Sequence, residues 1–238
     1  IQNNSLINKW LIYRTSLNVV APNYACPLKS GSVDIIEHEK SATVKRVTWT
    51  NSEFHYFDHN MAKDMKSFFE KAHSPNIFMK DCDGIIFFEN EGQKYMFLTE
   101  LKSKFDTTQL IKAKTQLISS FLKTNMLLNL SACYKLEDYI VKGFVISHPP
   151  KSDFLVSLRQ CSLLSERNDY KFASRLFLED KIHTLNDKIH QTTMLPTDCN
   201  CLYRLPLGNR GVFDKIEFIH IAIPETEDSV ILDVKKYI

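Results

Sequence analysis

The chain has 238 residues, of which 44% are hydrophobic and 24% charged, and its formal net charge is +2. These are ordinary globular values, and a chain of this length can bury a substantial core. The mildly positive charge is compatible with a nucleic-acid partner. Six glycines and the lack of a GxGxxG or Walker motif exclude the usual phosphate-binding loops, and no apolar run reaches 18 residues, so we expect a soluble protein.

The first predicted elements precede residue 80. Residues 43–49 read TVKRVTW, and their alternation of charged and β-branched residues predicts a strand. A helix is expected over 60–72, because four apolar residues recur on one helical face: Met61, Met65, Phe68 and Phe69. Glu70 lies beside this stripe.

Two hydrophobic segments flank a polar turn in the central part of the chain. Residues 80–88 read KDCDGIIFF and residues 94–105 read KYMFLTELKSKF, with ENEGQ between them. This pattern predicts an antiparallel hairpin that turns at Glu91-Gly92. A three-residue loop with a glycine bulge is an equally common hairpin and would shift the register by one residue.

Both hairpin segments carry acidic residues where apolar ones are expected. With the turn at Glu91-Gly92, Asp83 lies opposite Glu100 and Asp81 lies opposite Lys102; Glu100 and Lys102 share a face of their strand. Opposed side chains are about 4.5–5.5 Å apart at Cβ, so two carboxylates there destabilise the sheet unless a cation lies between them. A divalent metal such as Mg²⁺ satisfies this need.

A long amphipathic helix is expected from about Asp106 to Asn129, with Asp106 or Thr107 as its N-cap. Its apolar residues lie on one face: Leu110, Ile111, Leu117, Ile118, Phe121 and Leu122. Lys112, Gln116 and Lys123 lie on a flank at helical spacing. Two interpretations stay open: a solvated flank, or a functional one in which Gln116 orients Lys102 or a water and Lys112 contacts phosphate.

The remaining elements follow this helix. Residues 139–147, YIVKGFVIS, predict a third core strand, and 151–195 are polar and helix-like. The two C-terminal runs 216–224 and 229–238 predict a hairpin, in which His220 would lie opposite Asp233. An antiparallel hairpin, a helix and a further strand together favour an α/β fold of α+β type, a mixed sheet with helices packed on it.

The six cysteines are scattered, and neither their spacing nor that of the histidines resembles a zinc site. We expect free thiols in a reducing cytoplasm, because disulfides are rare there. No signal-peptide pattern is present, which also favours a cytoplasmic location. Because the first residue is Ile rather than Met, the sequence is consistent with a fragment of a longer chain.

Asp83, the Glu100-x-Lys102 triplet and Gln116 resemble the pattern of the PD-(D/E)XK nuclease superfamily. That pattern has an acidic residue at the start of one strand, a hairpin, Glu-x-Lys on the next strand, and a helix that often carries Gln. Here Cys82 stands where the family usually has Pro. The resemblance covers about 50 of the 238 residues and implies a restriction-endonuclease-like sheet in a single domain over 1–238, with a catalytic core at about 60–147 and a helical elaboration at 151–195.

The resemblance implies a metal-dependent endonuclease that hydrolyses phosphodiester bonds, most naturally in double-stranded DNA. Asp83, Glu100 and the Leu101 carbonyl would bind Mg²⁺, which Mn²⁺ could replace, and Lys102 and Gln116 would complete the catalytic set. Glu70 or Glu37 is a further metal contact or a solvated surface acid. Three lysines are expected to bind nucleic acid: Lys80, Lys104 and Lys112. A restriction or defence role would fit, with a homodimer or a partner protein selecting the target.

Two other functions are consistent with the same residues. The domain could keep a nuclease-like fold as an inactive nucleic-acid-binding or protein-interaction module, or its strand acids could form ordinary salt bridges with Lys102 and Lys80 in a domain of unrelated activity. The triplet Asp233-x-Lys235 is a rival to Glu100-x-Lys102 because it too ends a predicted strand. Only the triplet at 100–102 has an upstream acid and a downstream glutamine helix.

Overall fold

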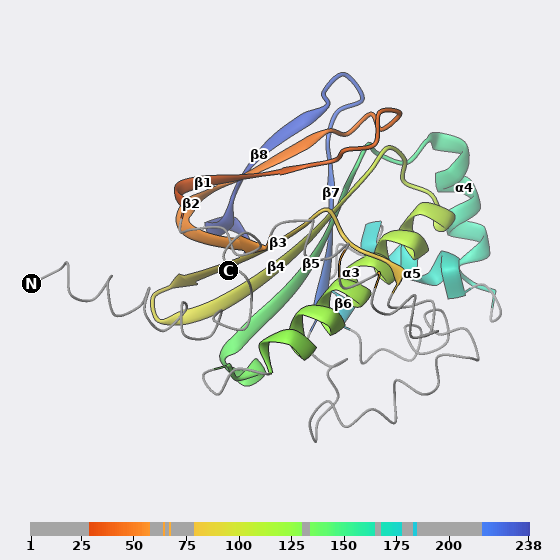
Figure 1. The fold of residues 1–238 in the computed structure, drawn as a ribbon. Helices are drawn as coiled ribbons and strands as arrows, with labels where there is room; N and C mark the ends of the chain where they lie inside the picture. The colour runs from red at the N-terminus through yellow and green to blue at the C-terminus, as the bar shows by residue number, and fades with distance from the viewer. Residues whose placement is uncertain are drawn as a thin grey trace, which may run out of the picture.

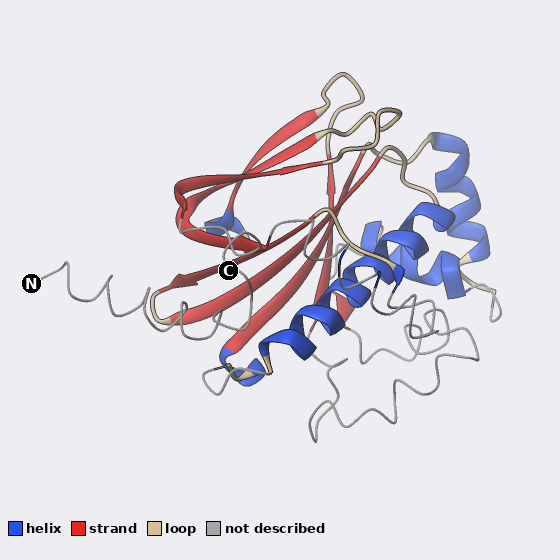
Figure 2. Cartoon of the chain, viewed as in Figure 1, coloured by secondary structure: helices blue, strands red, loops and turns tan. Residues whose placement is uncertain are grey.

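The computed structural model describes residues 29–57, 64, 67, 79–129, 134–164, 168–177, 183–184 and 216–238. It shows the predicted mixed α/β architecture (Figures 1 and 2). The central part of the sheet runs in the order β3-β4-β5-β7-β6. The bounds of these strands are β3 (Gly84–Asn90), β4 (Gln93–Lys102), β5 (Tyr139–Ser147), β6 (His183–Thr184) and β7 (Ile216–Ala222).

The two faces of this sheet are covered differently. Three helices pack on one face: α3 (Thr107–Leu128), α4 (Ser152–Cys161) and α5 (Asn168–Phe177). Three strands fold over the other: β1 (Lys29–Ile36), β2 (Arg46–Phe57) and β8 (Ser229–Asp233). Strand β2 joins these strands to the central sheet, since its residues 46–54 pair with β1, 46–50 pair with β8 and 55–57 pair with β3. The short 3-10 helices η2 (Leu136–Asp138) and η5 (Val234–Lys236) complete the described elements.

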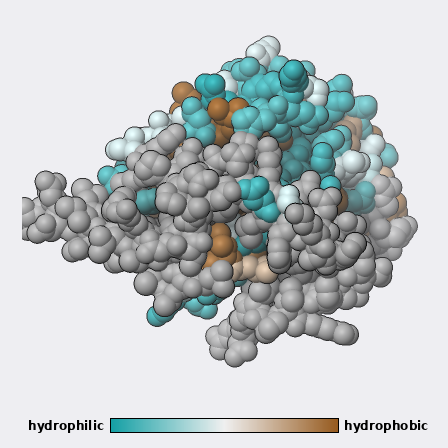
Figure 3. Space-filling model, in the orientation of Figure 1, coloured by the Kyte–Doolittle hydropathy of each residue, from teal (hydrophilic) through white to brown (hydrophobic). Residues whose placement is uncertain are grey.

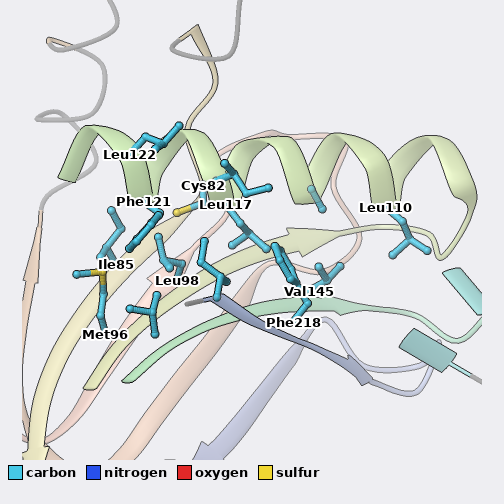
Figure 4. Packing of buried hydrophobic residues seen from close by; sticks show 14 of the residues in the cluster. Cys82, Ile85, Met96, Leu98, Leu110, Leu117, Phe121, Leu122, Val145 and Phe218 are labelled. Carbon is cyan, nitrogen blue, oxygen red and sulfur yellow. The ribbon is translucent and has the colours of Figure 1, made fainter. Parts of the chain in front are cut away.

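Alternation along β4 divides the core in two. Met96 and Leu98 point to α3, whereas Phe97 and Leu101 point to the β1-β2-β8 side, where Trp49 packs edge-on against Phe97 at 5.3 Å between ring centroids. Figure 4 shows the cluster that contains Met96 and Leu98, packed between α3 and the strands. Because Glu100 and Lys102 continue the same alternation as Met96 and Leu98, they too lie on the helix-facing side.

The predicted hairpin and its register are confirmed. Gly84 pairs with Thr99 and Asn90 with Gln93, and the two turn residues Glu91 and Gly92 have φ of 50° and 86°. Positive φ at both central residues is the signature of a two-residue type I′ turn, whose twist matches that of the strands. The competing three-residue loop is therefore excluded, and Asp83 lies one residue before β3, on the side of Glu100.

Gly84 is required by close packing between β3 and β1. A Cβ added at this position would lie 2.4 Å from Cδ1 of Ile35. A larger residue at position 84 would therefore require the Ile35 side chain to move, and glycine allows the two to pack closely just after Asp83.

The predicted central helix is also confirmed. Asp106 is the N-cap of α3, and its side chain accepts a hydrogen bond from the backbone N–H of Gln109 at 2.8 Å. The helix leads into β5, which lies parallel to β4 as a helical crossover requires. Cys82 and Cys161 are free thiols. Within the described residues, no helix combines the length and apolar character needed to span a bilayer.

Two predictions about the C-terminal half are wrong. The runs at 216–224 and 229–238 form no hairpin: β7 pairs with β5 and β8 pairs with β2, both in parallel, and His220 lies opposite Val145 rather than Asp233. The segment 151–195 is helical in α4 and α5, but its residues 183–184 form strand β6 on the edge of β7. In both cases a strand partner distant in sequence overrides the local pattern.

Candidate active site

The structure brings four predicted site residues together under α3. Glu100 and Lys102 end β4 and are 0% and 7% exposed, respectively. Asp83 directly precedes β3, the strand that neighbours β4, and the side chain of Gln116 extends from α3 to Lys102. Ionisable groups are almost never buried unless they are paired or functional, so this cluster is the strongest polar feature of the helix-facing core.

Lys102 is held by two partners. Its Nζ forms an ion pair with Oε1 of Glu100 and donates a hydrogen bond to Oε1 of Gln116 at 2.9 Å. The amide nitrogen of Gln116 donates to the backbone carbonyl of Asp81 at 2.8 Å. Gln116 therefore connects the lysine on β4 to the segment that leads into β3, which is the contact that an orienting role requires.

Asp83 is bonded to the backbone of β4. Its Oδ2 accepts a hydrogen bond from the N–H of Leu101 at 2.6 Å, so the Leu101 peptide lies at the site while the Leu101 side chain is buried on the other face. Burial and the charge of Glu37 raise the pKa of Asp83 to about 7, although the Leu101 N–H and the charges of Lys102 and Lys112 act in the opposite direction.

Glu100 carries the clearest sign of an incomplete environment. Burial, reinforced by the charge of Asp83, raises the pKa of its carboxyl well above the usual range, against the stabilising effect of Lys102. Its second oxygen, Oε2, is buried and has no hydrogen-bond partner among the described residues. An orphaned buried carboxylate oxygen is costly, and a proton or a cation would satisfy it.

These donors fit a hard divalent cation. Mg²⁺ is commonly held by one or two carboxylates, with water and substrate phosphate completing its shell. Asp83, Glu100 and the Leu101 peptide provide oxygen donors of this kind. In the described part of the chain, no three His, Cys, Asp or Glu side chains converge on a common metal position, so water and substrate would have to supply the remaining contacts.

Glu37 is the candidate for a further acidic residue at the site. Its charge acts on both Asp83 and Glu100. It follows the end of β1, and its backbone N–H donates to the carbonyl of Lys45 at 2.9 Å. Glu70, the other predicted contact, lies outside the described residues.

Three side chains that sequence reasoning did not assign hold the segment before β3. Ser119 donates to the carbonyl of Lys80 at 2.5 Å, Ser120 accepts from the N–H of Cys82 at 2.8 Å, and buried Lys123 bonds the same Lys80 carbonyl at 2.8 Å. Lys123 also forms an ion pair with Asp81, so the expected pairing of Asp81 with Lys102 is wrong. Together with Gln116, these side chains recur every three or four residues along one ridge of α3, and this spacing is the signal that could have identified them.

The three lysines expected to contact nucleic acid, Lys80, Lys104 and Lys112, are all exposed. Two of them are close in sequence to the buried cluster, since Lys80 precedes Asp83 and Lys104 follows Lys102, and the charge of Lys112 acts on Asp83. Exposed cations near a buried acidic centre suit a polyanionic substrate.

No family model, curated protein or solved structure matches this chain. The functional interpretation therefore depends on the four clustered residues and their geometry.

Proposed function

We propose that this protein is a metal-dependent deoxyribonuclease that hydrolyses phosphodiester bonds. One observation carries the proposal: a fully buried Glu100 uses one carboxylate oxygen for Lys102 and leaves the other without a partner, beside Asp83. An ordinary buried salt bridge would satisfy both oxygens, because an unpaired buried charge is destabilising. A cation bound by Glu100 and Asp83 completes the arrangement.

The residues would divide the chemistry between them. Asp83, Glu100 and the Leu101 carbonyl would hold Mg²⁺, which supplies acidity to water and offsets negative charge at the reacting phosphate. The ammonium of Lys102 has three protons, and Glu100 and Gln116 accept two of them. The third can donate to the attacking water or to a phosphate oxygen, so Lys102 orients the nucleophile and neutralises developing charge.

Gln116 and the α3 ridge would act as positioning residues. Through Gln116, Ser119, Ser120 and Lys123, one helix face fixes both the lysine and the segment that carries Asp83. Catalysis requires side chains held close to their reactive geometry, and a rigid helix provides this better than a loop.

The experiment is an incubation of the purified protein with supercoiled plasmid, single-stranded DNA and RNA. Each is tested with Mg²⁺ or Mn²⁺ and with excess chelator. We expect cleavage of DNA that requires metal and disappears in a Glu100→Gln variant whose thermal unfolding remains cooperative. Cleavage that persists at the wild-type rate in Glu100→Gln would overturn the assignment of this site, and a wild-type protein that binds metal but cuts no nucleic acid would instead support an inactive nuclease-like module.

A further inference from the structure

A cavity of about 430 Å³ lies where three neighbouring parallel strands end. Its walls come from 103–106 after β4, 148–154 after β5, and Glu225 after β7. The volume is in the range of sites for small organic ligands. In the view of Figure 3, hydrophilic residues cover the upper part of the molecule, over the loops at this end of the sheet.

This cavity adjoins the candidate active site. Lys104 and Phe105, which line it, follow Lys102 by two and three residues. Two residues of extended chain span at most about 7 Å, so the cavity wall at Lys104 begins within about 7 Å of the Lys102 backbone. A group bound there would belong to the same substrate as the reacting phosphate.

Part of the wall is aromatic. The rings of Phe105 and Phe154 lie 6.0 Å apart at their centroids with a 67° angle between planes, and Pro149 extends the apolar surface. Phe105 is buried, whereas Phe154 is half-buried. The ring of Phe154 also lies 5.9 Å from that of Tyr170 at the centroids. A half-buried aromatic side chain in the wall beside polar groups suits stacking with a planar ring, which is how sequence-tolerant proteins bind bases.

The charges in the wall argue against a site for a bare anion. Two lysines, Lys104 and Lys151, are outnumbered by three acids, Asp106, Asp153 and Glu225. Two of these acids are engaged locally, since Asp106 caps α3 and Asp153 accepts from the N–H of Phe154 at 2.9 Å. Mixed donors and acceptors suit a neutral group that both donates and accepts hydrogen bonds, such as a nucleobase.

His148 supplies a buried polar atom at the cavity. The residue is 8% exposed, and its Nδ1 lies 3.4 Å from the carbonyl of Ile223. A ring fixed by one nitrogen presents the other to a ligand, as donor or acceptor according to tautomer.

We infer that this cavity binds an unpaired nucleotide of the substrate, adjacent to the phosphate that reacts. The base would lie against Phe154 and hydrogen-bond to His148, and its sugar-phosphate would lie toward Lys104 and Lys151. This inference depends on the proposed nuclease function and narrows its substrate: DNA with an unpaired nucleotide at the cleaved bond, such as an overhang, frayed end or single strand, is preferred over continuous duplex.

The first test compares two labelled duplexes of the same sequence, one fully paired and one with a single unpaired nucleotide. Stacking of one base contributes about 1–3 kcal/mol, so we expect a preference of about tenfold for the unpaired substrate in kcat/KM. Phe154→Ala should reduce that ratio toward one. Lys135→Ala is the matched control, since this exposed lysine precedes β5 at the opposite end of the strand. Equal rates on both duplexes would overturn the inference.

Because Phe154 also packs against Phe105, its variant could unfold. Lys151→Ala avoids this difficulty, as Lys151 is exposed and gives α4 no side-chain cap. We expect Lys151→Ala to weaken binding of a single-stranded oligonucleotide several-fold and to lower its salt dependence by about one counterion. Affinity and salt slope equal to those of Lys135→Ala would contradict the inference.

The last measurement separates this inference from the proposed function. A single-stranded oligonucleotide containing 2-aminopurine is added to the Lys102→Ala protein without metal, and stacking against Phe154 should quench its fluorescence. Quenching that Phe154→Ala removes supports the cavity even if the wild-type protein cuts nothing. Metal-dependent cleavage with no quenching would overturn the cavity and leave the nuclease function standing.

Discussion

Two triplets of an acid, one residue and a lysine lie at the ends of strands in this protein, and the fold gives them opposite properties. Glu100 and Lys102 share the helix-facing side of a central strand and are buried together. Asp233 ends the short strand β8 and accepts a hydrogen bond from the backbone N–H of Lys235 at 2.9 Å, capping η5. The same sequence pattern is thus a buried ion pair in one place and a local cap in the other.

The direction of the pKa shifts expresses this difference. Burial raises the pKa of Glu100, whereas the hydrogen bond from the Lys235 backbone lowers the pKa of Asp233. A surface carboxylate with a low pKa is stable in its charged form without a bound cation, whereas a buried carboxylate needs a nearby cation to stabilise its charge. A triplet therefore becomes a candidate metal site only when its strand continues under a covering helix, as β4 does under α3.

The largest expected effect is on DNA cleavage when Lys102 is removed. Lys102→Ala should lower kcat for DNA cleavage by about 10²–10⁴-fold, because it removes the group that orients the nucleophile. Lys235→Ala, the matched control, should stay within about twofold of wild type. The rates are compared on one plasmid at saturating Mn²⁺. A Lys102→Ala protein with wild-type rates would refute the catalytic assignment.

The second effect is on the pH dependence of stability, measured with chelator present. The folded pKa of Asp83, about 7, is above its unfolded value of 3.8. Its contribution is therefore complete below pH 4 and is lost as the pH rises through 7, which costs about 3 kcal/mol between pH 5 and pH 8.

Urea unfolding at several pH values measures this change. Asp83→Asn should remove the part of this loss that Asp83 contributes, because the neutral amide does not titrate. Asp233→Asn should keep the wild-type profile, because the pKa of Asp233 is lowered and lies below this window in both states. A wild-type stability that rises between pH 5 and pH 8 in chelator would contradict the buried environment of the site.

The third effect is stabilisation by metal alone. At a Mn²⁺ concentration about 100 times the dissociation constant, binding to the folded state adds about 2.7 kcal/mol, which raises Tm by about 5–10 °C for a protein of this size. Glu100→Gln should abolish that rise, and Asp233→Asn should retain it. Equal metal-induced shifts in the two variants would place the binding site elsewhere.

The smallest effect distinguishes the cap from the site. Asp233→Ala removes the hydrogen bond to Lys235 at a partly exposed position, so Tm should fall by no more than about 2 °C. DNA cleavage should be unchanged. A large loss of activity in this variant would show that the C-terminal triplet contributes to the chemistry after all.

Local sequence was sufficient for the elements whose partners are close in the chain. Glu91-Gly92 encodes its turn through two positive φ values, and Asp106 encodes the start of α3 through its cap. Because the hairpin fixes its own register, the approach of Asp83 to Glu100 was also predictable. The partner of Gln116 was predictable as well, since α3 directly follows β4 and leads to β5.

Distant pairing was not predictable in the same way. Strands β7 and β8 have apolar patterns that suit a hairpin, yet each joins a parallel neighbour more than 50 residues away in sequence. Asp81 likewise pairs with Lys123 instead of Lys102, because the chain leaves the ladder before β3 and meets the far end of α3. Neither outcome has a local signal.

The sequence by itself determined the turn, the long helix and the strand that carries Glu100 and Lys102. It therefore determined which chemical groups this strand carries. Only the tertiary structure decided which of the two acid-x-Lys triplets is buried, which oxygen of Glu100 is left without a partner, and which cavity lies beside Lys102. The physical reason is that turns and caps depend on backbone geometry within a few residues, whereas desolvation depends on what the rest of the chain packs on top.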